Sequence, residues 1–273
     1  MNEKMREVIN IGDRNLIESL RCSKSCATYM SILNGTNKGK IWVDSLEKPS
    51  FAIVWGEHLE GFQLMGKPLD AKHYKDLRVF FESELNSFLK DRSKEEFEYA
   101  ADTEELLEMM NNVFYDKNIE WGWQYNYKVV EYKTVDLKNQ DMCSIVSIDT
   151  DFFHMAYSNV SYVLDEIAKA WGNVDRYLDN GIGFAVIKDN EIASKIISIA
   201  AYDGNYVLGV DTLASSRRLG YASLLLRKVL NDASEKGYSI LWDCDGFNEA
   251  SKKTAQNQDL VFDYKYKVCW VEL

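Results

Sequence analysis

The chain has 273 residues, with 32 Lys and Arg against 43 Asp and Glu, and its formal net charge of −11 opposes general binding to nucleic acid or to an anionic membrane. Hydrophobic residues make up 46% and only two prolines occur, which excludes a low-complexity chain and predicts two domains or one large one. No apolar run of 18 residues and no apolar signal core occurs, and the five cysteines are scattered, so we expect a cytoplasmic protein with reduced thiols.

The first half of the chain predicts helices, then short strands, then alternating helices and strands. Apolar residues at helical spacing predict helices within residues 1–33, and Asn34-Gly35 is a stop signal. The elements expected after them are strands 41–43, 51–55 and 61–65, a helix 71–89, a strand 96–100, a helix opened by Thr103 and a strand 119–133. Residues 134–141 are polar and predict a linker.

The second half repeats this order. Its expected elements are helices 151–171 and 174–178, strands 183–187, 192–201 and 206–212, a helix 219–236, a strand 239–242, a helix capped near Asn248 and a strand 261–273. Asp189-Asn190 and Asp203-Gly204 are typical of hairpin turns, and Gly237 is typical of the residue that ends a helix. The sequence therefore predicts an α+β protein of duplicated architecture, with domains at 1–135 and 140–273.

The stretch 210–223 joins a predicted strand to the strongest helix of the chain. Backbone N–H groups at a helix start have no intrahelical partner and lie at the positive end of the helix dipole, so a pyrophosphate is a natural occupant. Gly220 and Ala222 would let a ligand approach the backbone, and Arg217 and Arg218 add local positive charge. A glycine at such a turn can also be a purely steric requirement.

Two short motifs make the chemistry of this stretch more specific. One is [Q/R]-x-x-G-x-[G/A] at the turn, and the other is an Asn followed at spacings of three and four by a small residue and an Ala; the matching residues are Arg217, Gly220, Ala222, Asn248, Ser251 and Ala255. On these motifs residues 140–273 resemble the GCN5-related N-acetyltransferase (GNAT) superfamily. The string Asp211-Thr212, Arg217 and Gly220-Tyr221-Ala222, with Trp242-Asp243-Cys244, further resembles a bacterial subgroup that includes the zwittermicin A resistance acetyltransferase. Residues 1–135 fit that subgroup's leading domain, a candidate degenerate copy of the fold.

The resemblance implies a GNAT fold in the second half, a mostly antiparallel mixed sheet with flanking helices. It implies transfer of an acetyl group from acetyl-CoA, the co-substrate, to a primary amine of a small molecule by direct attack in a ternary complex. In such a fold two central strands splay apart around the pantetheine arm, and a backbone N–H near Leu213 donates to the developing oxyanion. The residues it assigns to cofactor binding are Thr212, Leu213, Ala214, Arg217, Arg218, Leu219, Gly220, Tyr221, Ala222, Ser223, Asn248 and Ser251.

The catalytic acid and base of the family have no direct match. Ala255 stands where many members have a tyrosine that protonates the thiolate, and residues 205–208 lack a glutamate base. The candidate replacements are Tyr264 and Tyr266 as acid and Asp211 and Asp243 as base. Asp211 also suits a turn cap and Asp243 a structural hydrogen bond, and a water relay could replace the base.

Other interpretations stay open. A non-catalytic acyl-CoA-binding module would explain the missing tyrosine, and transfer to a protein or peptide amine is a further alternative. Aromatic residues on the helices at 151–178, which cover the acceptor site in the family, fit core packing better than acceptor binding; they are Phe152, Tyr157, Tyr162, Trp171 and Tyr177. Neither the cysteines nor the three histidines have metal-site spacing, so no metal is expected, and the oligomeric state stays unknown.

Overall fold

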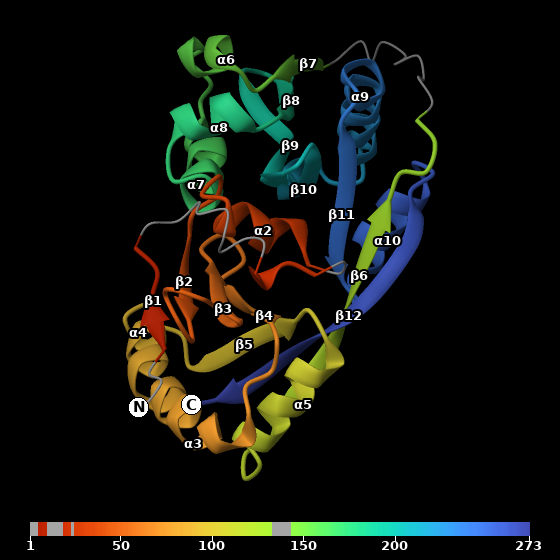
Figure 1. Ribbon diagram of the computed structural model, residues 1–273. Coiled ribbons are helices and arrows are strands. Elements are labelled where there is room, and N and C mark those ends of the chain that lie inside the picture. The colour runs from red at the N-terminus through yellow and green to blue at the C-terminus, as the bar shows by residue number, and fades with distance from the viewer. Residues whose placement is uncertain (1–4, 10–18, 23–24, 133–142) are drawn as a thin grey trace. The chain divides into compact units, whose positions relative to one another are not determined.

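Residues 5–9, 19–22, 25–132 and 143–273 are described by the structure, a computed structural model. The chain divides into two units, the first formed by Met1–Trp123 with Tyr266–Leu273 and the second by Gln124–Lys265. Figure 1 labels the elements of both. Each unit is a mixed α+β structure.

The sheet of the first unit is antiparallel apart from one parallel pair. Its strands, in spatial order, are β1 (Arg6–Glu7), β2 (Gly39–Val43), β3 (Phe51–Gly56), β4 (Gly61–Gly66), β5 (Glu96–Ala101) and the end of β12 (Val261–Glu272). Only β4 and β5 run parallel. Strand β3 is buried along its whole length, which explains its unbroken apolar sequence.

The helices of the first unit confirm most of the predicted ones. They are α2 (Ala27–Leu33), η1 (Ala71–His73), α3 (Tyr74–Phe80), a π-turn η2 (Phe81–Leu85), α4 (Asn86–Lys90) and α5 (Glu104–Val113). Thr103 caps α5 through its hydroxyl, which accepts from the N–H of Leu106 at 3.4 Å. The prediction of helices from the start of the chain is wrong at Arg6–Glu7, which pair with β2 as a strand, and most of the first predicted helix lies outside the described residues.

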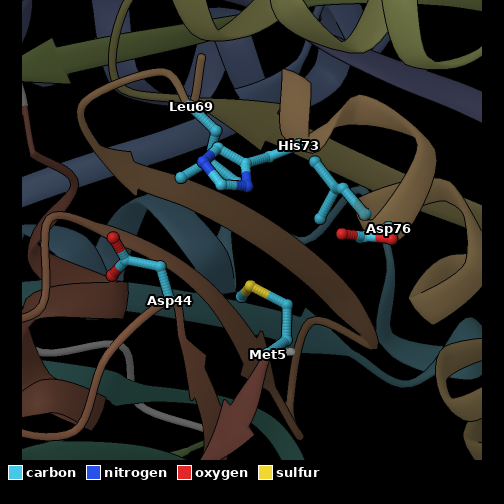
Figure 2. A pocket seen from close by; sticks show the side chains of 6 residues that line it. Met5, Asp44, Leu69, His73 and Asp76 are labelled. Atoms are coloured by element: carbon cyan, nitrogen blue, oxygen red, sulfur yellow. The ribbon is translucent and has the colours of Figure 1, made fainter. Parts of the chain in front are cut away.

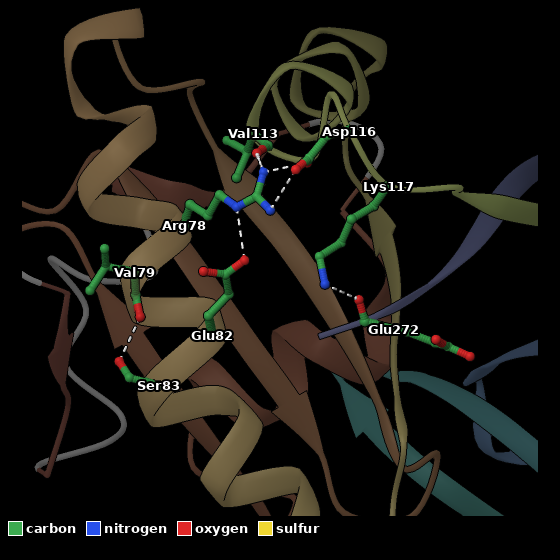
Figure 3. A network of polar contacts seen from close by, with 8 residues as sticks. All are labelled: Arg78, Val79, Glu82, Ser83, Val113, Asp116, Lys117 and Glu272. Atoms are coloured by element: carbon green, nitrogen blue, oxygen red, sulfur yellow. Dashed lines mark hydrogen bonds and ion pairs between the residues drawn. The ribbon is translucent and has the colours of Figure 1, made fainter.

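A polar network holds the end of α5 in the first unit (Figure 3). Arg78 of α3 donates to Asp116 at 2.5 Å, to Glu82 at 2.8 Å and to the carbonyl of Val113 at 3.4 Å. The hydrogen bonds that Arg78 donates to these two carboxylates, that to Asp116 first, raise the pKa of Arg78. Because both carboxylates are largely exposed, we assign the network a local positioning role with little effect on stability.

A buried carboxyl lies at the end of β5 in the same unit. Asp102 accepts hydrogen bonds from Gln63 at 2.8 Å, from the hydroxyl of Ser25 at 2.5 Å and from the thiol of Cys22 at 3.5 Å. Burial raises the pKa of Asp102, and these three donors oppose the rise. The cluster accounts for Cys22 as a structural thiol.

The sheet of the second unit also has one parallel pair, β10 with β11. Its strands, in spatial order, are the end of β6 (Glu120–Lys128), β11 (Ser239–Asp245), β10 (Asn205–Thr212), β9 (Glu191–Tyr202), β8 (Gly183–Lys188) and β7 (Ser144–Ser147). Its helices are α6 (Thr150–His154), α7 (Ser161–Ala170), α8 (Val174–Asn180), η3 (Ala214–Ser216), α9 (Tyr221–Lys236) and α10 (Glu249–Gln256).

The helical stretch predicted at 151–171 is interrupted between α6 and α7. Asn159 lies in the interruption, and its side chain pairs with the backbone of Ile192, accepting from its N–H at 2.9 Å and donating to its carbonyl at 3.1 Å. The connection is thereby tied to the start of β9. The hairpin turns are confirmed, because Asp189, Asn190 and Asp203 all have positive φ angles.

The duplicated order of elements is confirmed, with one exchange. Residues of β6, the last strand of the first half, pair with β11, and residues of β12, the last strand of the second half, pair with β5. Each unit therefore takes its final strand from the other half of the sequence. The predicted boundary at 135–140 lies outside the described residues, so the domain ranges 1–135 and 140–273 stay a prediction.

The two faces of the second sheet carry different side chains. Ile196 of β9 belongs to the core formed with α9, together with Leu208 and Trp242. Lys195, its neighbour, contacts α7 instead. Since side chains alternate along a strand, α7 and α9 cover opposite faces of β9.

Candidate functional site

Strands β10 and β11 are paired only over the first part of their length. Their parallel register holds Asn205↔Ser239, Tyr206↔Ile240 and Val207↔Leu241, and no further pair occurs among the described residues. Beyond this point β10 stays paired with β9 and β11 with β6. The N–H and C=O groups of β10 that face away from β9 after Val207 thus have no strand partner in the described part of the chain.

The direction of the backbone groups of β10 follows from one hydrogen bond. The N–H of Leu213 donates to the carbonyl of Ala193 at 3.0 Å, so this N–H points toward β9. The N–H of Leu213 is therefore occupied, and an oxyanion donor near Leu213 stays a prediction for the neighbouring N–H groups. Because antiparallel hydrogen bonds alternate, the N–H groups of Leu208 and Val210 point to the other side, where β11 has departed.

The turn after β10 presents backbone N–H groups at the start of α9. Gly220 has φ 81° and a Cβ placed on it would meet nothing within 4 Å. The first helical hydrogen bond runs from the N–H of Leu224 to the carbonyl of Gly220 at 3.0 Å. The N–H groups of Tyr221, Ala222 and Ser223 therefore precede the helical ladder, and none of them has a hydrogen-bond partner among the described residues.

The helix thus begins two residues later than predicted, and Leu219 lies in the turn with an exposed side chain. Arg217 and Arg218 are exposed beside it. The Nε of Arg217 donates to the carbonyl of Thr212 at 3.2 Å, which holds the guanidinium against the end of β10. Ala214 belongs to the short helix η3 and is exposed as well.

The second motif forms the start of α10. The side-chain oxygen of Asn248 accepts from the N–H of Ser251 at 3.0 Å, and the hydroxyl of Ser251 accepts from the indole N–H of Trp242 at 2.9 Å. Ala255 is fully buried. The motif therefore has a structural explanation, a capped helix fixed to β11, and of these polar side chains the amide nitrogen of Asn248 is the group that makes no hydrogen bond among the described residues.

The catalytic candidates lie on three strands. Asp211 is exposed on β10, and its Oδ1 accepts from the N–H of Thr212 at 2.8 Å. Asp243 lies on β11 opposite Asn126 of β6. Tyr264 and Tyr266 lie on β12, but only Tyr264 belongs to the unit that contains the turn.

A buried polar cluster beside Asp211 was missed from the sequence. Lys195 pairs directly with Asp211 across β9 and β10, so both side chains lie on the α7 face. Lys195 is 3% exposed. Its ammonium forms an ion pair with Glu166 and donates a hydrogen bond to the carbonyl of Tyr162 at 2.7 Å. Burial first, then hydrogen bonding of the hydroxyl to Asp211 and the charge of that carboxylate, raise the pKa of Tyr162. The available signal was a single lysine within the apolar strand Ile192–Ala201.

The corresponding turn of the first unit has different chemistry. After β4 the chain passes through Lys67 to Asp70 into η1 and α3, with a proline at residue 68 and no glycine. Figure 2 shows the small hollow beside it, whose lining is Met5, Asp44, Leu69, His73, Asp76 and Leu77. Carboxylates in this lining would repel a phosphate.

The described residues were also searched for metal ligands, membrane-spanning helices and disulfides. No group of three or more potential metal ligands is close together there, and no helix in it is long and apolar enough to cross a membrane. None of the cysteines within it forms a disulfide.

We compared the chain with protein-family models, curated proteins and solved structures. The family model described as GNAT acetyltransferase matches residues 18–269. The uncharacterized N-acetyltransferase YdfB of Bacillus subtilis (strain 168) is 22% identical over 232 residues, 84% of each chain. A GCN5-related N-acetyltransferase-like protein from Streptococcus suis 89/1591 superposes with a TM-score of 0.64 at 19% identity, over 94% of this chain and 96% of that one. A tandem GNAT protein from the clavulanic acid biosynthesis pathway gives 0.57 at 9% identity, over 98% of each chain.

Proposed function

The chain belongs to the GNAT acetyltransferase family, and on this premise we propose that its second unit transfers the acetyl group of acetyl-CoA to the primary amine of a small molecule. The observation that carries the proposal is the parting of β10 and β11 directly before the turn at Gly220. One place thereby offers unpaired strand backbone for an amide-containing arm and helix-start N–H groups for a pyrophosphate. These are the two parts of acetyl-CoA that a protein must hold.

The turn fits the pyrophosphate in its shape and charge. The open space at Gly220 admits a ligand to the N–H groups of Tyr221, Ala222 and Ser223, and the dipole of α9 favours an anion there. Arg217 and Arg218 supply positive charge in a protein whose net charge is negative. The remaining assigned residues line the same turn or, for Asn248 and Ser251, the start of α10.

Acetyl-CoA supplies an activated acetyl group as a thioester. The residues of β10 would stabilise charge and accept a proton while the amine attacks it. The N–H groups of Leu208 and Val210 point away from β9 and would donate to the carbonyl oxygen as it gains negative charge. The carboxylate of Asp211 would accept a proton from the acceptor's ammonium. The amine nitrogen then bonds to the acetyl carbon as the C–S bond breaks, and Tyr264, the candidate tyrosine that lies in this unit, would protonate the leaving thiolate. The second proton that the nitrogen loses would return to the tyrosine through water, and the first would leave Asp211 for solvent. Tyr266 belongs to the first unit and has no role in this proposal.

The first unit would not bind the cofactor under this proposal. Its equivalent turn at residues 67–70 lacks the glycine and carries one lysine and one aspartate where the second unit carries two arginines, and two further carboxylates, Asp44 and Asp76, line the hollow beside it. We propose that the first half of the chain is a degenerate copy of the fold, whose last strand, β6, completes the sheet of the second unit with its residues 124–128.

The test is a thermal shift with acetyl-CoA followed by release of free thiol with an amine panel, for the wild type and for Asp211→Asn. Asp211→Asn should retain the shift and lose most of the turnover. Absence of a shift in the wild type would refute the proposed function. A shift without thiol release for any amine would instead favour an acyl-CoA-binding module, in line with the absence of a tyrosine at Ala255. Turnover with peptides alone would identify a peptide amine as acceptor.

A further inference from the structure

The polar cluster between α7 and β10 has a composition that suits an amino group. Its members are Tyr162, Glu166, Lys195 and Asp211, all in the second unit. Only Asp211 has a role in the proposed function. The two carboxylates exceed the one buried cation by a negative charge. Arg217 is a further cation nearby: its charge lowers the pKa of Tyr162, and its guanidinium donates to the carbonyl of Thr212.

The hydroxyl of Tyr162 lies buried beside Asp211. This oxygen makes no hydrogen bond of normal length among the described residues. The carboxylate of Asp211, as an acceptor for the tyrosine O–H and as a nearby charge, contributes to the raised pKa of Tyr162. One oxygen of Asp211 is occupied by the N–H of Thr212. The tyrosine O–H is directed at the carboxylate, and the remaining lone pairs of the tyrosine oxygen and of Asp211 are acceptors side by side, which a single N–H-rich group could bridge. A buried polar atom without a partner is costly, and a ligand donor would remove that cost.

Gly209 leaves room above strand β10 for the carboxylate of Glu166. Gly209 lies two residues before Asp211 on the same face, and a Cβ there would come within 3.0 Å of Glu166 Oε1 and 2.8 Å of Ile199 Cγ2. The carboxylate of Glu166 thus lies over the bare backbone of β10, just beyond Val207, where the two strands part. Lys195, the ion-pair partner of Glu166, keeps that carboxylate in place.

From these observations we propose that Tyr162 and Asp211 bind the acceptor's primary ammonium, with Glu166 as a second carboxylate beside it and Lys195 as the residue that positions Glu166. The inference rests on the proposed function and names its substrate class: an acceptor that arrives as a cation. Tyr162 is a binding residue and takes no part in proton transfer. A neutral analogue with a hydroxyl in place of the ammonium would bind weakly, because it carries no charge to meet the carboxylates.

The test compares Tyr162→Phe with Tyr177→Phe. Tyr177 on α8 is a matched control, since its hydroxyl is also buried without a partner in the described residues but lies over Gly183 of β8. Asp165→Asn, on the exposed side of α7, controls for changes in that helix. The probes are putrescine, spermidine, tyramine and glucosamine. Each variant is assayed for the KM of the amine, the KM of acetyl-CoA, kcat, and the thermal shift caused by acetyl-CoA.

Tyr162→Phe should raise the amine KM roughly ten- to hundredfold, the value of one hydrogen bond to a charged group, and leave kcat, the acetyl-CoA KM and the thermal shift near their wild-type values. Both controls should match the wild type. An unchanged amine KM, an equal rise in Tyr177→Phe, or a parallel rise in the acetyl-CoA KM would overturn the inference.

The two proposals fail differently. A wild type that shifts with acetyl-CoA but neither binds nor acetylates these amines would overturn the ammonium site and leave the cofactor site standing. A wild type without an acetyl-CoA shift would overturn both.

Discussion

Gly220→Ala tests the turn with unusual selectivity, because the same chain contains its control. Gly220 and Gly237 lie at the two ends of α9, with φ angles of 81° and 77°, and a Cβ at either would meet nothing within 4 Å. Alanine at each position would suffer the same left-handed backbone strain, about 1–2 kcal/mol, without a steric clash. The two variants should therefore lose similar stability, about 2–4 °C in Tm for each kcal/mol in a chain of this size.

Their affinities for acetyl-CoA should differ. The added methyl of Gly220→Ala projects into the space through which a pyrophosphate would reach the first N–H groups of α9, whereas that of Gly237→Ala lies at the far end of the helix. Loss of one hydrogen bond to a charged group is worth about 1.5–3 kcal/mol, so the Kd of Gly220→Ala should rise at least about tenfold. Isothermal titration calorimetry of both variants measures this difference. Equal Kd values in the two variants would refute the assignment of the turn.

Three further predictions concern other residues. Asn248→Ala removes the cap of α10, where the side chain accepts from Ser251, and should cost about 1 kcal/mol of unfolding free energy in a denaturant titration; an unchanged midpoint would contradict the cap. Glu166→Gln leaves Lys195 buried without its ion-pair partner and should cost about 3 kcal/mol, whereas the additional change Lys195→Met should restore most of it; no restoration would contradict the pairing. Asp102 has a raised pKa in the folded state, so the native protein keeps this proton where the unfolded chain has lost it, and the contribution of Asp102 to stability falls as pH rises from about 4. Relative to wild type, Asp102→Asn should therefore gain stability between pH 4 and pH 7, and a constant difference in denaturation midpoints would contradict this sign.

Features set by local sequence could be predicted. Thr103 and Asn248 cap their helices as expected, and the turn residues Asp189 and Asn190 adopt positive φ angles, because each of these conformations depends on a few neighbouring residues. The turn at Gly220 belongs to this group. Its motif also pointed to the family that the comparisons then showed.

Features that depend on pairing between distant segments could not be predicted from the sequence. Nothing in residues 120–128 indicates that the strand pairs with β11, because an alternating strand fits many partners equally well. The cluster around Tyr162 depends on α7 packing onto β9 at Lys195, which no local pattern records. The occupied N–H of Leu213 likewise follows from the register of β10 with β9.

The central claim is that the second unit alone binds acetyl-CoA, at the turn of Gly220. Calorimetric stoichiometry tests it most directly, with the wild type and Gly220→Trp titrated side by side. We expect one acetyl-CoA per wild-type chain and none for Gly220→Trp, with both proteins showing the same far-ultraviolet circular dichroism. Two sites per chain, or one site that survives in Gly220→Trp, would contradict the claim.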